Sequence, residues 1–64
     1  PKPDLTMRAQ DLRRRLGALV ARHGASQLTS LEHAAVEQAL GSNTAEDLEV
    51  AEKALAHAEN RLDR

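Results

Sequence analysis

The chain has no cysteine and no aromatic residue, and each absence excludes a class of function. Without cysteine there is no disulfide framework, no CxxC redox centre and no thiolate metal site. Without Phe, Trp or Tyr there is no platform on which single-stranded nucleic acid could stack. No apolar run approaches the roughly 18 residues that span a bilayer, and the opening PKPD resembles neither a signal nor a transit peptide. We therefore expect a cytoplasmic protein with no membrane partner.

The residues that are present favour helices. Among 64 residues there are twelve Ala and ten Leu, but only three Val and no Ile, which almost excludes strands. A chain of this length forms one domain at most, so we treat residues 1–64 as a single small helical domain. The composition predicts an all-α fold, either a three-helix bundle or a helical hairpin, with two long helices and a short middle one.

Capping residues predict the bounds of the two long helices. The first is expected over about residues 5–23, with Asp4 as its N-terminal cap and Gly24 as its left-handed end. The third is expected over about residues 45–63. The hydroxyl of Thr44 can accept a hydrogen bond from a backbone N–H in its first turn.

The middle helix is marked by a capping box. Thr29 is followed three residues later by Glu32, a pattern that predicts a helix over about residues 30–40, which Gly41 would end. We expect its apolar residues to form a broad face that closes the bundle. These residues are Leu31, Ala35, Val36, Ala39 and Leu40.

Apolar residues on both long helices repeat at the spacing of a coiled-coil seam. Intervals of three and four alternate, so that in the third helix leucines recur every seven residues with alanines between them. Two seams of matching period predict close, supercoiled packing. The seam residues are Leu5, Ala9, Leu12, Leu16, Leu19 and His23 in the first helix, and Leu48, Ala51, Leu55, Ala58 and Leu62 in the third.

Charged residues border both seams. Arg8, Arg15 and Arg22 lie seven residues apart along the first seam, at heptad position g. Glu52 and Glu59 lie seven apart along the other, at position e. Because g faces e only when neighbouring helices are parallel, these charges predict that the first and third helices are parallel, in an up-down-up arrangement.

The length of the middle helix predicts an offset between the long helices. At 1.5 Å per residue it would climb only about 16 Å, against about 28 Å for each long helix. The third helix would then start level with Arg13, with Glu52 near Arg15. The start of the first seam and the end of the other would then have no partner inside one chain, and a second chain would have to cover them. The uncovered residues would be Leu5 and Ala9 at one end and Ala58 and Leu62 at the other.

These seams predict a small helical protein-protein interaction or oligomerisation module, such as an adaptor, a chaperone-like subunit or a regulator. It would act as a homodimer or with a heteromeric protein partner. The leucines would supply affinity, while the charges, each exposed pair contributing about 0–1 kcal/mol, would set orientation. The predicted interface residues are Leu5, Ala9, Leu12, Leu19, Leu48, Leu55, Ala58 and Leu62, with Arg8, Arg15, Arg22, Glu52 and Glu59 as orienting charges.

The arginines of the first helix support an alternative, sequence-nonspecific nucleic-acid binding through Arg13, Arg14, Arg15 and Arg22. The first 25 residues hold six Lys and Arg against two Asp. At 100° per residue, however, the consecutive arginines point in three directions. A helix-turn-helix is disfavoured because acidic residues at the start of the third helix would face phosphates. A solvated or salt-bridged helix face is the simpler interpretation.

No residue pattern indicates an enzyme, a metal site, a cofactor or a small-molecule ligand. The hydroxyl residues sit at caps and turns, and there is no glycine-rich phosphate loop. The three histidines form no metal-binding motif. We expect His33 to pair with Glu37 one turn away, His57 to be solvated, and His23 to cap the end of the first helix.

Overall fold

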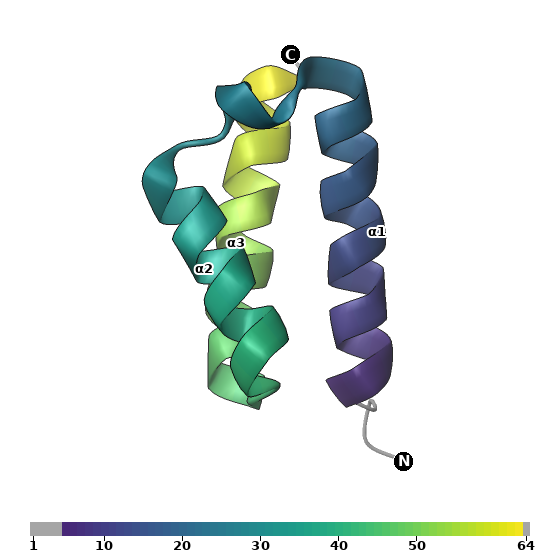
Figure 1. The fold of residues 1–64 in the computed structure, drawn as a ribbon, viewed down its shortest axis with the longest axis vertical. Coiled ribbons are helices and arrows are strands. Elements are labelled where there is room, and N and C mark those ends of the chain that lie inside the picture. The colour runs from purple at the N-terminus through teal and green to yellow at the C-terminus, as the bar shows by residue number, and fades with distance from the viewer. Residues whose placement is uncertain (1–4, 64) are drawn as a thin grey trace.

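Helices form most of the chain in the computed structural model, which describes residues 5–63. The elements are α1 (Leu5–His23), a short 3₁₀ turn η1 (Ala25–Gln27), α2 (Ser30–Ser42) and α3 (Ala45–Leu62). α1 and α3 run in the same direction and α2 runs against them (Figure 1). The expected all-α three-helix bundle and its up-down-up order are confirmed. Within residues 5–63, no helix has the length and apolar character needed to cross a membrane.

The hydrophobic core lies along α3, which packs against both other helices, whereas α1 and α2 contact each other little. Four leucines, two on α1 and two on α3, expose no more than 1% of their surface. Burying a leucine stabilises a fold by about 1.5–3 kcal/mol, so these four are the main source of stability. The core comprises Ala9, Leu12, Leu19, Leu28, Val36, Ala39, Leu48, Ala51, Leu55 and Ala58.

The predicted N-terminal caps of α2 and α3 are present. Thr29 Oγ1 accepts from the Glu32 N–H at 3.1 Å, and Glu32 Oε1 accepts from the Thr29 N–H at 2.8 Å, which completes the capping box. Thr44 Oγ1 accepts from the Asp47 N–H at 3.3 Å. The predicted Asp4 cap of α1 lies outside the described residues.

The helix ends were predicted correctly at α1 but not at α2. Gly24 follows α1 as predicted, but its φ of 94° and ψ of 146° lie outside the left-handed helical region that was expected; residues with a Cβ rarely adopt this conformation. Gly41 does not end α2, which continues through Ser42 to a left-handed Asn43 with φ of 57°. Asn tolerates this conformation better than most residues, and the Asn43 N–H donates to the Ala39 carbonyl at 2.9 Å.

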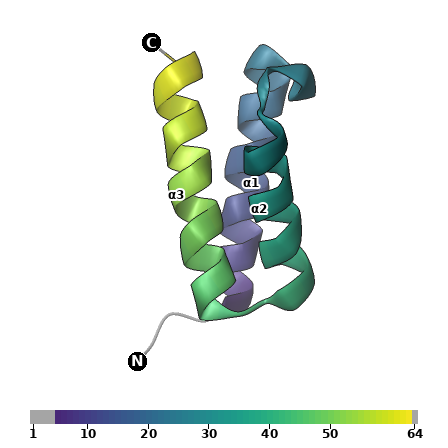
Figure 2. The same ribbon diagram turned by 90° about the vertical axis from the view of Figure 1, so that its left-hand side faces the viewer.

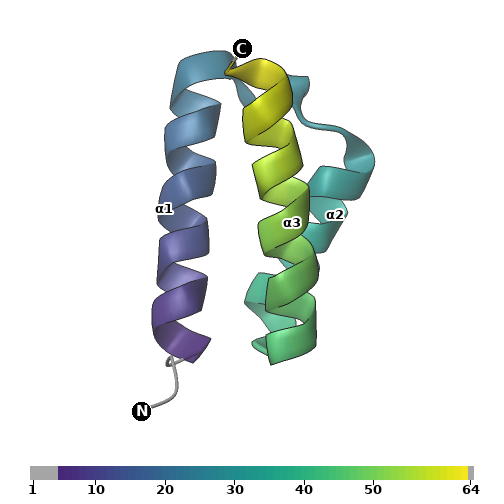
Figure 3. The ribbon, with the colours of Figure 1, turned by 180° about the vertical axis from the view of Figure 1, so that it is seen from behind.

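The predicted offset between the long helices is wrong. Arg8, not Arg15, pairs with Glu52, so α1 and α3 begin at nearly the same level (Figure 3). α2 has 13 residues and climbs about 20 Å. The link after α1 also runs downward before α2 starts (Figure 1), and together the two return the chain to the start of α1.

The prediction that two ends lack partners within the chain is therefore also wrong. Ala9 is 8% exposed and Ala58 is fully buried. Leu5 and Leu62 are half-buried and pack against the core. With no offset, each end of one long helix lies beside the matching end of the other, so a single chain covers both seams.

Candidate functional site

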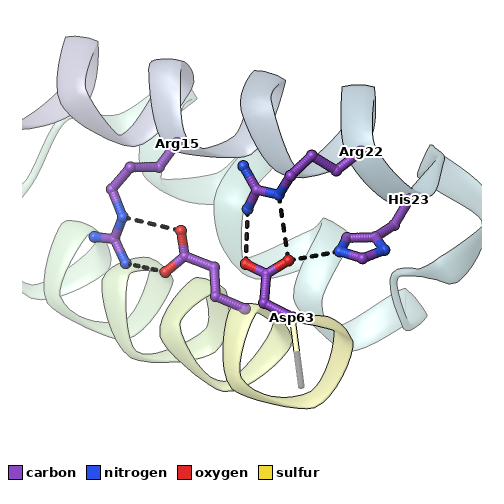
Figure 4. Close-up of polar contacts among 5 residues, drawn as sticks. Arg15, Arg22, His23 and Asp63 are labelled. Carbon is purple, nitrogen blue, oxygen red and sulfur yellow. Dashed lines mark hydrogen bonds and ion pairs between the residues drawn. The ribbon is translucent and has the colours of Figure 1, made fainter.

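A ladder of three ion pairs closes one border of the α1–α3 seam. In each, an arginine of α1 donates two hydrogen bonds to one carboxylate, from Nη2 at 2.7 Å and from Nε at 3.2–3.4 Å. Figure 4 shows the pairs that Arg15 and Arg22 form. The predicted charges thus meet within one chain, one heptad away from the expected register. The pairs are Arg8–Glu52, Arg15–Glu59 and Arg22–Asp63.

Asp63 is the one partner in this ladder that was not predicted from the heptad spacing. Its Oδ1 also lies 2.6 Å from His23 Nε2 (Figure 4). Hydrogen bonds from Arg22 and then His23 hold the pKa of Asp63 below its usual value. A signal was present, because Asp63 lies one helical turn after Glu59 and extends the same acidic border.

The predicted nucleic-acid residues do not form one cationic surface. Arg15 and Arg22 turn toward carboxylates of α3. Arg13 and Arg14 are exposed, and neither forms an ion pair with any residue between 5 and 63. Two adjacent arginines on different sides of a helix offer little to a row of phosphates.

An open apolar groove of about 300 Å³ lies between α2 and α3, on the face turned away from α1. Figure 2 views the bundle from this side, with α1 behind. Leu31 of α2 is 80% exposed and Val50 of α3 is 58% exposed. Ala35 and Ala54, both half-buried, line the space between them. The prediction that Leu31 belongs to the bundle-closing face is wrong, because this side chain is exposed to solvent at the edge of the groove.

One end of the groove is closed by an ionic cluster around Glu32, which is only 6% exposed. Arg61 Nη1 and Nη2 donate to its two carboxylate oxygens at 2.7 and 3.1 Å, and Nη2 also donates to the Gln27 carbonyl at 2.8 Å. His57 Nδ1 lies 3.5 Å from Glu32 Oε2. The bonds from Arg61 and from the Thr29 N–H lower the pKa of Glu32 to about 2, although burial opposes this shift.

This cluster is structural in character. A carboxylate with a pKa of about 2 is a weak base near neutral pH, and both of its oxygens already accept hydrogen bonds. Nowhere in residues 5–63 do three or more His, Asp or Glu side chains gather as metal ligands would. The arrangement instead holds the start of α2 against the end of α3 and keeps the groove in shape.

The histidines differ in part from their predicted positions. His33 does not pair with Glu37; its Nε2 lies 3.4 Å from the Ala25 carbonyl and so contacts the η1 turn. His57 is exposed, as expected, but it also reaches the carboxylate of Glu32.

Comparison with models of known protein families, with curated proteins and with solved structures gives no match to this chain.

Proposed function

We propose that this chain is a small protein-interaction module that binds an apolar helical segment in the groove between α2 and α3. The observation that carries the proposal is the exposure of Leu31 and Val50, 80% and 58%, on either side of a groove with an apolar floor. An exposed apolar patch framed by polar groups is a usual mark of a protein-binding surface. The partner's apolar side chains would be removed from water against these two residues.

The shape of the groove supports a helix as the bound element. Two packed helices form a channel, and Ala35 and Ala54 let a third helix axis approach closely because their side chains end at a methyl group. The Glu32–Arg61 contact holds one end of the channel before any partner arrives. A preformed groove binds at a smaller cost in conformational entropy than one that must be ordered.

The proposed interaction surface lies away from the seams. The predicted interface leucines face each other inside the chain, and the predicted orienting charges pair there as well. Their intramolecular packing removes the reason for assigning them to a second chain. The functions suggested by the sequence, adaptor, chaperone-like subunit or regulator, would be exercised through the α2–α3 face.

Site-specific photo-crosslinking tests the proposal in cells that express the protein. A photoreactive amino acid replaces Leu31 in one variant and Met7 in another; Met7 is an exposed apolar residue of α1, 66% exposed, that does not line the groove. We expect a discrete adduct from position 31 only, and its mass shows whether the captured chain is a second copy or another protein. Adding Val50→Glu should abolish it, because a carboxylate would be buried against apolar surface.

Crosslinking at position 31 that gives no discrete adduct would refute the proposal. Adducts of equal yield from positions 31 and 7 would do the same, because they would show random collision. A circular dichroism spectrum of the Val50→Glu variant checks that loss of the adduct is not loss of the fold.

A further inference from the structure

The outer face of α3 carries a second row of residues, separate from the seam. Glu46, Val50, Ala54, His57 and Arg61 follow one another at intervals of four, four, three and four. This spacing places all five on one side of the helix, and four of the five, all except Glu46, line or border the groove. The row is therefore suited to lie along another helix.

The row matches a copy of itself when the two copies run in opposite directions. Antiparallel pairing centred between Lys53 and Ala54 sets Glu46 of each copy opposite Arg61 of the other, and Val50 opposite His57. Parallel pairing would set Arg61 against Arg61. Opposite charges that meet across a two-fold axis give a closed, self-complementary contact.

The groups needed for this contact are accessible. Glu46 is exposed and forms no ion pair with another described residue. The Arg61 side chain is 36% exposed, and its contacts with Glu32 and the Gln27 carbonyl are made through Nη1 and Nη2, so neither contact uses the Nε–H. An exposed guanidinium edge and an exposed carboxylate can thus meet without disturbing the ionic cluster.

We propose that a second copy of this chain occupies the groove, with the two α3 helices antiparallel about a two-fold axis near Ala54. This inference rests on the proposed function and names its partner. Seated in the groove, the partner's α3 also contacts α2, where Leu31 covers part of it and Ala35 allows close approach. A face two helices wide and about 20 Å long offers about 400 Å² of flat area, below the roughly 800 Å² per partner of a standard interface, so the dimer is expected to be weak.

Disulfide trapping tests the axis, since the natural chain has no cysteine to interfere. In Ala54→Cys the new thiols lie close to the proposed axis and should form a disulfide-linked dimer under mild oxidation. Ala56→Cys is the control, because Ala56 is exposed on α3 but points away from the groove. Equal trapping of both variants, or none of Ala54→Cys, would overturn the proposal.

Sedimentation equilibrium tests the charge pairing in reduced protein, over concentrations from about 10 µM to 1 mM. The unmodified chain should approach a dimer mass, and Glu46→Lys should weaken association by about tenfold, because it sets lysine against Arg61 of the other copy. Glu37→Lys, on the α2 surface away from the groove, should leave the mass unchanged.

A monomer mass for the unmodified chain at about 1 mM would overturn the homodimer. That result would leave the proposed function standing if photo-crosslinking at position 31 still captures a different protein. Loss of both the dimer and the crosslink would remove both proposals.

Discussion

Replacing Glu32 by Gln tests the ionic cluster that joins α2 to α3. Folding lowers the pKa of Glu32 from 4.5 to about 2, mainly through Arg61. Because the pKa is lowered in the folded state, the stabilisation is complete above about pH 4.5 and is lost as the pH falls toward about 2. Glu32→Gln keeps the size of the side chain and its capping contact with Thr29 but removes the charge.

The expected effect follows from the size of this shift. At about 1.36 kcal/mol per pH unit, a fall from 4.5 to about 2 corresponds to roughly 3 kcal/mol. Solvent reaches Arg61, whose side chain is 36% exposed, and screening reduces the value to about 2 kcal/mol. A chain of 64 residues is stable by about 3–10 kcal/mol, so the variant should remain folded enough to measure.

Urea unfolding followed by circular dichroism, at several pH values between about 7 and 2, measures the free energy of unfolding of both proteins. Glu32→Gln should be about 2 kcal/mol less stable than the natural chain near pH 7 and equally stable near pH 2. Other carboxylates whose pKa values are lowered, such as Glu52 and Asp63, destabilise both proteins alike in acid. Glu37→Gln, an exposed change on the same helix, should follow the natural chain throughout.

A gap between the natural chain and Glu32→Gln that stays constant across this pH range would refute the reasoning. Such a result would mean that the amide lowers stability through packing or hydrogen-bond geometry, and that the charge of Glu32 contributes nothing.

Three further changes test the fold. Leu55→Ala, at a site 1% exposed, should lower the free energy of unfolding by about 2–5 kcal/mol. An unchanged thermal midpoint would contradict the place of Leu55 in the core. Gly24→Ala should cost roughly 1–3 kcal/mol in urea unfolding because the φ of 94° strains a residue with a Cβ, and a neutral result would rule out this backbone conformation. Arg15→Glu should lower stability and the added Glu59→Arg should restore most of it, with a coupling of about 0.5–1 kcal/mol; additive losses would show that the two side chains do not meet.

The local structure of this protein could be predicted from its sequence because it depends on neighbouring residues. The hydroxyl of Thr29 caps α2 because Glu32 lies one turn later, and the seams of α1 and α3 follow from their leucine spacing. The parallel direction of α1 and α3 was also within reach, because an arginine border faces a glutamate border only in that orientation. The end of α2 is an exception, because Gly41 and Asn43 both tolerate a helix end and the local sequence does not decide between them.

Only the tertiary structure decided the register and the groove. Arginines and glutamates that recur every seven residues match equally well after a shift of one heptad, so Arg15 could have met either Glu52 or Glu59. The downward link and the full length of α2 select Glu59. The outward position of Leu31 and the contact between Arg61 and Glu32 depend on how α2 packs against α3 across 29 residues of chain, a distance over which sequence periodicity carries no information.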